Sequence, residues 1–305
     1  MDFLYLLEKI RLPGLNECML LITRLGEETA LLVIALIAFW CVNKRHGYYI
    51  LGVGLLGTMA NQVLKLLCRV PRPWVIDPDF KILEEAREAA TGYSFPSGHT
   101  QTAVGTFGAL AVVTRNKAFR TACIVLAVLV PISRMYVGVH TPLDVSVGAI
   151  MALALVFFLR KVVYDKDGKY ISAMLIGMLA VSVAFLLFVE LWPFPADMDA
   201  ENLASGVKNA YTMIGCTTGL LLCYYLDEKY IHFSVKAVWW VQILKVVLGL
   251  AVVLLVKEGL RSPLDSLFAG HMAARAVRYF LIVVVAGAAW PLSFPLLAKC
   301  NNKKG

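Results

Sequence analysis

The stretch "SRMYVGVHTPLDVSVGAIMALALVFFL", residues 133–159, joins a short polar segment to a long apolar run. Thr141-Pro142-Leu143-Asp144 is typical of a helix start, with threonine as the cap, proline at the first helical position and an acid in the first turn. The apolar run at 143–159 approaches the length that a hydrocarbon core of about 30 Å requires. This stretch therefore predicts a membrane-spanning helix with polar residues at one end.

The whole chain has the composition of a membrane protein. Of its 305 residues, 59% are hydrophobic and 16% are charged, which is too apolar for a soluble domain of this length. Nine apolar runs lie between charged breaks, and a run of about 20 such residues spans a bilayer. We therefore predict an all-α, polytopic membrane bundle of about nine spans, at residues 28–42, 47–67, 100–113, 121–132, 143–159, 170–191, 210–226, 237–256 and 277–297.

The segment before the first span differs from the spans because it mixes apolar residues with charges such as Glu8, Lys9 and Arg11, and Pro13-Gly14 breaks it in two. This pattern predicts an interfacial amphipathic segment, and the absence of a cleavable signal pattern predicts that it is retained. A polar turn, "YDKDGKY" at 164–170, marks the boundary between the core and the C-terminal part. The predicted parts are residues 1–27, a core at 28–165 and a C-terminal transmembrane extension at 166–305.

Cysteine usage and charge exclude several classes of site. The seven cysteines, at positions 18, 41, 68, 123, 216, 223 and 300, are scattered and mostly lie in apolar runs, so we expect no disulfide or zinc framework. The formal net charge is +8, but lysine and arginine occur in short loops between spans and form no basic face interleaved with aromatic residues. This distribution favours membrane topology over nucleic-acid binding.

Alternate loops differ in their charge. One set is short and basic, and includes Lys44, Arg45 and Lys236, whereas the other is longer and rich in acids, as in "DPDFKILEEAREAA". The positive-inside rule makes the first set cytoplasmic. It places the polar stretch "YSFPSGHT", residues 93–100, on the extracytoplasmic or lumenal face.

Lys65 and Arg72 lie where the second predicted span ends, in "KLLCRVPRP". The planar fork of arginine and the mobile charge of lysine together suit a tetrahedral oxyanion. Basic residues also anchor span ends at lipid headgroups, and for this pair alone that is the more common role.

Pro96-Ser97-Gly98-His99 opens the third predicted span. Ser97 suits a helix cap, Gly98 permits close backbone approach, and the free N–H groups of a first helical turn attract an anion. His99 has the pKa range to give a proton to a leaving oxygen near neutral pH. Ser-Gly is also a common sequence at the start of a helix, so this segment alone fits a simple helix cap equally well.

The third segment is Ser133-Arg134, five residues, His140, three residues and Asp144. An acid one turn after the histidine can hold one imidazole nitrogen and leave the other free as a nucleophile. Ser262-Pro263-Leu264-Asp265 repeats the same helix start without a preceding histidine. Only the combination with His140 and Ser133-Arg134 therefore indicates a function.

Together the three segments resemble the type 2 phosphatidic acid phosphatase family, the membrane lipid phosphate phosphatases that share an active site with vanadium haloperoxidases. Lys65-x6-Arg72-Pro73, Pro96-Ser97-Gly98-His99 and Ser133-Arg134-x5-His140-x3-Asp144 match its motifs in order and without substitution. The motifs span residues 65–144, and the likeness in helix layout extends over roughly the first 165 residues. A weaker likeness, carried by "WCVNK" at 40–44, is to the sphingoid-base-phosphate phosphatase branch, whose eukaryotic members usually have Ser-Thr-His at this Ser-Gly-His.

The resemblance implies a role for each matched residue. His140 attacks phosphorus and forms a phosphohistidine, Asp144 orients it, and His99 protonates the departing alkoxide and then activates water. The residues implied to hold the phosphate are Lys65, Arg72, Ser97, Gly98 and Arg134. Neither a metal nor another cofactor is implied.

The expected function is hydrolysis of a lipid phosphomonoester or pyrophosphate at the membrane, with phosphatidate, isoprenyl pyrophosphate or sphingoid phosphate as candidate substrates. The lipid tail would stay in the bilayer while the phosphate enters the site. A phosphotransferase on the same scaffold and a non-enzymatic lipid transporter or scaffold are the alternatives, and the oligomeric state is open.

The second half of the chain carries two further candidates. Lys245 lies within a predicted span, where a charge is costly and indicates function by default, although a structural contact with Gln242 or Glu190 explains it equally well. His271, Arg275 and Arg278 have helical spacing. They suit a phosphate or an anionic headgroup, but an interfacial anchor or a subunit contact is the more common role.

Overall fold

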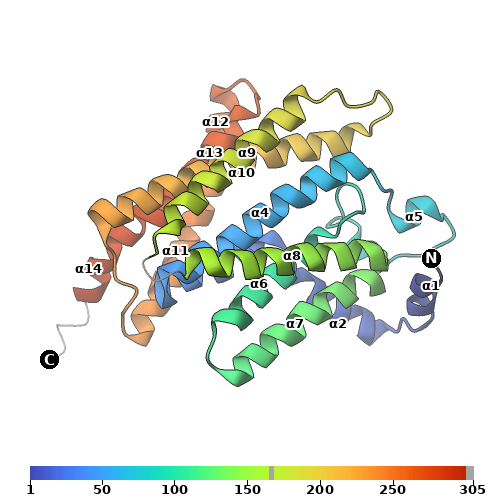
Figure 1. The fold of residues 1–305 in the computed structure, drawn as a ribbon, viewed down its shortest axis with the longest axis horizontal. Coiled ribbons are helices and arrows are strands. Elements are labelled where there is room, and N and C mark those ends of the chain that lie inside the picture. The colour runs from blue at the N-terminus through green and yellow to red at the C-terminus, as the bar shows by residue number, and fades with distance from the viewer. Residues whose placement is uncertain (165–167, 300–305) are drawn as a thin grey trace. The chain divides into compact units, whose positions relative to one another are not determined.

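The structure of the chain is a computed structural model that describes residues 1–164 and 168–299, without the side chains of the last two. Throughout the described ranges its regular elements are helices, which confirms the predicted all-α class (Figure 1). The chain forms two compact units that interleave along the sequence. The first unit is Met1–Leu32, Tyr49–Lys161 and Pro193–Gly206, and the second is Val33–Tyr48, Val162–Trp192 and Val207–Gly305. Because they interleave, these units do not test the predicted linear division, which stays a prediction.

The first unit contains the segments that match the three motifs. Its elements are α1 (Asp2–Lys9), α2 (Pro13–Arg24), the first half of α3 (Glu28–Ile37), most of α4 (Lys44–Cys68), α5 (Pro73–Ile76), η2 (Glu84–Ala86), α6 (Gly98–Val113), α7 (Lys117–Tyr136), most of α8 (Pro142–Val163) and the first turns of α10 (Ala200–Leu226).

α6 and α7 form a helical hairpin in this unit (Figure 1). Both helices begin at a side-chain cap, since the Ser97 hydroxyl accepts from the amide of Thr100 and the Asn116 carboxamide accepts from the amide of Phe119. Each cap satisfies an amide of the first turn that has no partner within the helix. The start of α6, which carries two of the predicted site residues, is thereby fixed in position.

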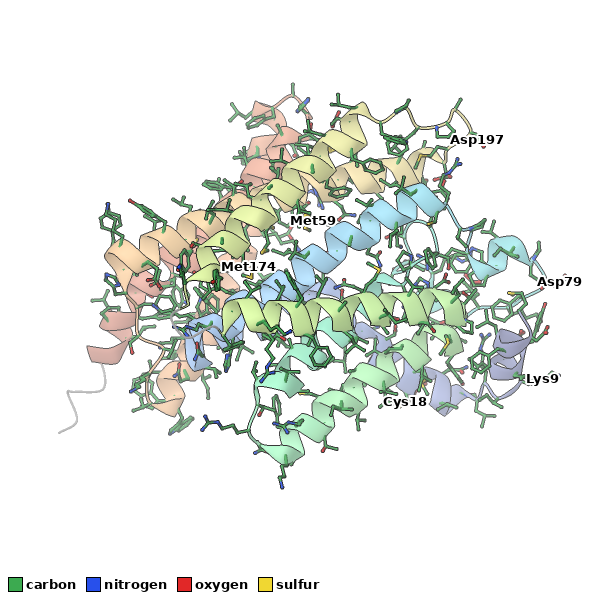
Figure 2. All side chains as sticks on the ribbon, viewed as in Figure 1. Lys9, Cys18, Met59, Asp79, Met174 and Asp197 are labelled. Carbon is green, nitrogen blue, oxygen red and sulfur yellow. The ribbon has the colours of Figure 1, made fainter. Side chains whose placement is uncertain are left out.

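The N-terminal helices pack against the rest of the first unit. The break predicted at Pro13 is confirmed, because α1 ends at Lys9 and α2 begins at the proline. The Tyr5 hydroxyl donates to Asp77 at 2.9 Å, and Figure 2 shows Lys9 and Asp79 at the same outer edge of the unit. These helices therefore cover the segment that follows α5. Their interfacial location in a membrane stays a prediction.

The second unit contains the rest of α3, the start of α4, the end of α8 and the C-terminal helices. Its remaining elements are η1 (Ala38–Val42), α9 (Tyr170–Leu191), most of α10, η3 (Asp227–Ile231), α11 (Trp239–Gly259), α12 (Arg261–Leu267), α13 (Ala273–Val284), η4 (Val285–Ala289), η5 (Pro291–Ser293) and α14 (Phe294–Lys299).

Close backbone approaches hold the second unit together. The fully buried Trp40 donates from its indole nitrogen to the carbonyl of Ala286 at 2.9 Å. A Cβ at Gly249 would lie 2.8 Å from the Trp40 ring, and a Cβ at Gly215 would collide with the carbonyl of Ala276. The glycines therefore let α11 reach Trp40 and let α10 pack directly on α13.

The number of spans differs from the predicted count. Among the described residues, six helical segments are long and apolar enough to cross a membrane, and the pair Pro13–Arg24 and Glu28–Val42, bent by 55°, adds a seventh if it is one span. The predicted nine is therefore only approximate. α6 has 16 residues, and α10 interrupts its apolar run with threonine, tyrosine and glycine. The apolar helices nevertheless make the chain an integral membrane protein.

The six cysteines within the described ranges are free thiols. Cys300 lies outside the described residues, as do positions 165–167 of the predicted polar turn at 164–170.

Candidate active site

All eight residues predicted for the site lie in the first unit, at or beside the ends of five helices. Lys65 is in the last turn of α4, and Arg72 is the cap of α5. Ser97 caps α6, so Gly98 and His99 are its first two residues. Arg134 is in the last turn of α7, His140 precedes α8, and Asp144 is in the first turn of α8.

The Asp144 carboxylate lies beside the imidazole of His140. Its Oδ2 is 3.5 Å from Nδ1 of His140, and it accepts hydrogen bonds from the Ser94 hydroxyl at 2.6 Å and from the Thr141 amide at 2.8 Å. Both His140 and Asp144 are only 1% exposed. An imidazole that keeps its proton on Nδ1, facing this carboxylate, has a lone pair on Nε2.

Arg72 lies on the Nε2 side of the same imidazole. Its Nη1 is 3.0 Å from Nε2 of His140 and also donates to the carbonyl of Val139 at 3.0 Å. Its Nε donates to the carbonyl of Gly92 at 3.0 Å, and its Nη2 to that of Thr91 at 2.8 Å. Three carbonyls therefore hold the guanidinium beside the nitrogen that is available as a nucleophile.

His140 lies in the segment between α7 and α8, in a strongly cationic environment. Burial lowers its pKa well below the usual value, and the positive charges of Arg72, Arg134 and Lys65 lower the pKa further. Burial disfavours the charged imidazolium, and each nearby cation repels the added proton. The imidazole is therefore neutral at physiological pH, the form that a nucleophile requires.

Two more cationic side chains are buried near this pair. Lys65 is 7% exposed and donates from Nζ to the carbonyl of Thr91 at 3.3 Å. Arg134 is fully buried and donates from Nη1 to the Thr23 hydroxyl of α2 at 2.8 Å. In the described part of the chain its Nε and Nη2 have no hydrogen-bond partner. Arg134 therefore holds donors that an anion can use.

The start of α6 is tied to the start of α8. The Ser97 amide donates to the carbonyl of Asp144 at 3.0 Å, and Gly148 permits this approach because a Cβ there would lie 2.7 Å from the Ser97 carbonyl. At Gly98 the nearest atom to an added Cβ would be 3.7 Å away, on Asn61. An added Cβ at Gly98 would therefore make only an ordinary van der Waals contact with Asn61.

His99 follows in the same turn of α6. Its Nε2 is buried and has no hydrogen-bond partner among the described residues, and its backbone packs against Gly26, where a Cβ would lie 2.9 Å from the His99 carbonyl. His99 is near enough to His140 to affect its charge. The structure thus brings both predicted histidines to one site. Nε2 of His99 forms no hydrogen bond to another described residue there.

Several groups at the site were not predicted from the sequence. Ser94 donates to Asp144, the carbonyls of Thr91 and Gly92 hold Arg72, and Thr23 holds Arg134. Ser94 lies in the polar stretch at 93–100, so its position beside Pro96-Ser97 was the one available signal. Thr23 is 111 residues from Arg134, and no local pattern marks it.

Lys245, in the second unit, has a structural role. It is 1% exposed, its Nζ donates to the carbonyls of Ser234 and Val235 at 3.3 Å, and it lies 4.4 Å above the Phe294 ring. Glu190 instead forms a hydrogen bond with Tyr211. Backbone carbonyls and an aromatic face stabilise the buried charge, so the expected pairing with Glu190 was wrong.

His271, just before α13, and Arg275 and Arg278 within it also make contacts in the second unit. Arg275 donates from Nε to the Thr212 hydroxyl at 2.7 Å, and the His271 ring meets the edge of Tyr211 at 6.2 Å. Arg278 is 9% exposed and its guanidinium lies 5.6 Å from the Tyr279 ring centre. His271 and Arg275 thus join α13 to α10, and contact with lipid or another subunit stays a prediction.

Comparison with known proteins places the whole site inside one family. The model described as the PAP2 superfamily matches residues 45–167, which include all eight predicted site residues. Phosphatidylglycerophosphatase B of Bacillus subtilis (strain 168) is 35% identical over 173 residues, which are 53% of this chain and 81% of that protein. The chain belongs to the PAP2 superfamily.

Other PAP2 superfamily comparisons extend this result. Undecaprenyl-diphosphatase BcrC of the same organism is 30% identical over 149 residues, covering 47% of this chain and 72% of that protein. Sphingosine-1-phosphate phosphatase 1 of Mus musculus is 25% identical over 256 residues, covering 77% of this chain and 57% of that protein. A second model, for the transmembrane extension of PAP2 superfamily phosphatases, matches residues 211–302. No solved structure matches the chain significantly. Membership of the PAP2 superfamily confirms the predicted resemblance and enzyme class, a phosphatase.

Proposed function

We propose that this chain hydrolyses the phosphate ester or pyrophosphate of a membrane lipid through a phosphohistidine at His140, without a metal. The observation that carries the proposal is the arrangement around one imidazole. Nδ1 of His140 faces the Asp144 carboxylate at 3.5 Å, and Nε2 faces the Arg72 guanidinium at 3.0 Å. An imidazole that a carboxylate orients, with its other nitrogen beside a fixed cation, is suited to attack a phosphate.

In the first step, the Nε2 lone pair of His140 forms the N–P bond as the P–O bond to the leaving group breaks. Asp144 accepts the hydrogen bond from Nδ1–H and stabilises the positive charge that develops on the ring. His99, in its imidazolium form, donates a proton to the departing lipid oxygen and becomes neutral. Burial and the cations Arg134, Lys65 and Arg72 lower the pKa of His99, and the negative charge of the bound phosphate favours the imidazolium against them. Burial and the two donors that hold Asp144 keep this carboxylate in place, so little reorganisation accompanies the reaction.

In the second step, water releases the phosphate. His99, now neutral, takes a proton from the attacking water as the new P–O bond forms. The N–P bond breaks and its electron pair returns to Nε2 of His140. His99 thereby recovers the proton that it donated, and the enzyme returns to its starting state.

The charge on the transferred phosphoryl group is met by the cations already described. Arg72 is held by three carbonyls, and Arg134 has two nitrogens without described partners. Lys65, Ser97 and the amides at the start of α6 complete the proposed phosphate site. These fixed positive charges supply the stabilisation that a metal gives in other phosphatases, which supports a metal-independent reaction.

The substrate class follows from the names of the relatives and from the position of the site. The three relatives are named for phosphatidylglycerophosphate, undecaprenyl diphosphate and sphingosine 1-phosphate, which share a phosphate on a lipid. In this chain the site lies at helix ends, where a phosphate can enter while the tail stays in the bilayer. The loop charges favour the extracytoplasmic or lumenal face. Lipids, and no nucleic acid, are the proposed partners.

The test is a panel assay on the purified full-length protein in detergent with EDTA. Phosphatidylglycerol phosphate, undecaprenyl pyrophosphate, phosphatidate and a sphingoid phosphate are offered to the wild type and to His140→Ala. We expect phosphate release from at least one lipid, and its loss in His140→Ala. His232→Asn is a matched control, because His232 is exposed and asparagine tolerates its positive φ of 44°.

Two results would overturn the proposal: phosphate release that persists in His140→Ala, or release that requires an added divalent metal. Transfer of phosphate to an acceptor other than water would identify the phosphotransferase alternative, and product analysis detects it directly. Binding of lipid phosphate without turnover would instead favour a transporter or scaffold.

A further inference from the structure

A short turn, residues 137–139, leads from the end of α7 to His140. Its three amides donate to carbonyls in the last turn of α7, at 2.9–3.2 Å. The other carbonyls at this helix end, and those of the turn itself, have no partner within the helix. The groups that bind these carbonyls from outside therefore decide where the turn is held, and with it the imidazole that follows.

Arg11, in the segment between α1 and α2, binds one of these carbonyls. Its Nε donates to the carbonyl of Tyr136, the last residue of α7, at 3.0 Å, and its Nη1 donates to the carbonyl of Lys81 at 2.5 Å. A cation at the carboxyl end of a helix is also favoured by the helix dipole. One guanidinium thus ties the end of α7 to the segment that precedes η2.

Arg11 also packs on the turn itself. Gly138 has a φ of +90°, and a Cβ there would lie 2.9 Å from Nη2 of Arg11 and 2.9 Å from the Phe80 ring. Only glycine permits this backbone conformation and this close approach together. The guanidinium lies 5.6 Å from the centre of the Phe80 ring. Arg11 and Phe80 therefore cover the same side of the turn.

The turn is held by other groups as well. The Leu83 amide donates to the carbonyl of Val137 at 3.0 Å. Nη1 of Arg72 donates to the carbonyl of Val139 at 3.0 Å and lies 3.0 Å from Nε2 of His140. The carbonyls of residues 136, 137 and 139 are thus bound by Arg11, Leu83 and Arg72. The position of the imidazole relative to the Arg72 guanidinium depends on all three contacts.

The N-terminal helices hold Arg11 in place. On α1, Leu4 is 1% exposed and packs in an apolar cluster with Phe80. On α2, Asn16 accepts a hydrogen bond from the Tyr136 hydroxyl at 2.7 Å. The PAP2 superfamily model begins at residue 45, so Arg11 lies outside the matched part of the chain. A side chain between two packed helices loses little further freedom when it forms its hydrogen bonds.

We infer that Arg11 is a positioning residue for the proposed nucleophile. Through the carbonyls of Tyr136 and Lys81 it fixes the turn, and through the turn it fixes the His140 imidazole beside Arg72. The effect on turnover rests on the proposed hydrolysis, whereas the hold on the turn does not. Arginine is required because its rigid fork reaches two carbonyls at once, and a lysine would keep the charge without that geometry.

Hydrogen exchange of the full-length protein in detergent, followed by mass spectrometry, tests the hold on the turn. Arg11→Lys should raise the exchange rate of the amides at 137–139 by about tenfold, because a turn that loses outer contacts opens more often. The matched control is Arg120→Lys. Arg120 also donates to two carbonyls, those of Ala111 and Thr114, at the other end of the α6–α7 hairpin. It should leave exchange at 137–139 within about twofold of wild type.

Steady-state kinetics, with a lipid phosphate that the wild type hydrolyses, tests the consequence for catalysis. Arg11→Lys should lower kcat by about tenfold and leave KM within about twofold, because a displaced nucleophile slows attack without removing a phosphate contact. Arg120→Lys should keep both constants within about twofold of wild type. Thermal unfolding checks that each variant is folded, and Arg11→Gln, which keeps one donor, replaces Arg11→Lys if that variant is not.

Three results would overturn the inference. One is unchanged exchange at 137–139 in a folded Arg11 variant, and another is equally faster exchange there in Arg120→Lys. The third is faster exchange in the Arg11 variant with an unchanged kcat, which would separate the turn from the reaction. If the wild type releases no phosphate from any lipid, the proposed hydrolysis fails, and the exchange comparison still supports or overturns the hold of Arg11 on the turn.

Discussion

The Ser94 hydroxyl donates a hydrogen bond to Oδ2 of Asp144 at 2.6 Å and lies 3.4 Å from Nδ1 of His140. This contact joins the segment before α6 to the start of α8. It gives the carboxylate a second donor besides the Thr141 amide, and a carboxylate with two donors keeps its orientation. Ser94 is therefore a positioning residue for the proposed nucleophile, acting through Asp144.

Ser94→Ala should lower kcat by about tenfold to a hundredfold while KM changes little. The hydroxyl bonds to the Asp144 carboxylate, which orients the proposed nucleophile, and one hydrogen bond to a charged group contributes about 1.5–3 kcal/mol. Steady-state kinetics checks this. Ser182→Ala removes a buried hydroxyl that is bonded to Thr217 in the second unit. Equal loss of kcat in these two variants would show that Ser94 has only a structural effect.

Arg72→Lys should lower kcat/KM by about a hundredfold or more. A lysine keeps the charge but cannot bond to Thr91, Gly92 and Val139 at once, so the cation beside His140 loses its fixed position. The matched control is Arg69→Lys, whose arginine is exposed and only 3.6 Å from the exposed Asp197 carboxylate. We expect that control within about twofold of wild type. Similar losses in both would contradict the role given to Arg72.

The acidic limb of kcat/KM against pH should lie below 6.5. The pKa of His140 is lowered from the usual 6.5 by burial and by nearby cations, so protonation of the free enzyme's nucleophile sets in at more acidic pH than for an exposed histidine. Activity falls as pH drops through this lowered pKa, because the imidazolium has no lone pair.

Arg72→Gln removes one of those cations and should move the acidic limb of kcat/KM toward 6.5, even though the rate is low. The profile is measured with a monoester and with a pyrophosphate, since titration of the substrate differs between them. A wild-type limb above 6.5 with both substrates would contradict the environment described for His140.

Thr23→Val should lower both stability and kcat/KM. The substitution preserves shape but leaves Nη1 of the buried Arg134 without its acceptor, a loss of about 1–3 kcal/mol in the free energy of unfolding. Thermal unfolding in detergent and steady-state kinetics measure the two effects. Thr218→Val, on an exposed position of α10 whose hydroxyl bonds only within its own helix, is the control. Unchanged kinetics in Thr23→Val would show that the contact of α2 with Arg134 does not affect catalysis.

Local chemistry explains what the sequence could predict. The helix start at Thr141 depends on neighbours, and the structure shows the reciprocal bonds between Thr141 and Asp144 that define it. The break at Pro13 and the cap at Ser97 are equally local. The motif residues were predictable because the three segments together combine cations, histidines and an acid in the order of one family's motifs.

Long-range contacts explain what the sequence did not predict. Ser94 and Asp144 are 50 residues apart, and Thr23 and Arg134 are 111 apart, so only the packing of separate helices brings them together. The suggested pairing of Lys245 with Glu190 was wrong because Lys245 bonds to backbone carbonyls of the preceding segment. A pattern of opposite charges in the sequence does not indicate a backbone partner. The span count was only approximate because an apolar run marks a helix without fixing the length of that helix.

Trapping of the covalent intermediate tests the central claim most directly. Wild-type protein and His140→Ala are mixed with a radiolabelled lipid phosphate, quenched in alkali during turnover, and assayed for label that is stable to base and lost in acid, as a phosphoramidate bond is. The account predicts such label on the wild type, mapped to the peptide that contains His140, and none on His140→Ala. Turnover of the wild type without any trapped label, or label that persists on His140→Ala, would contradict it.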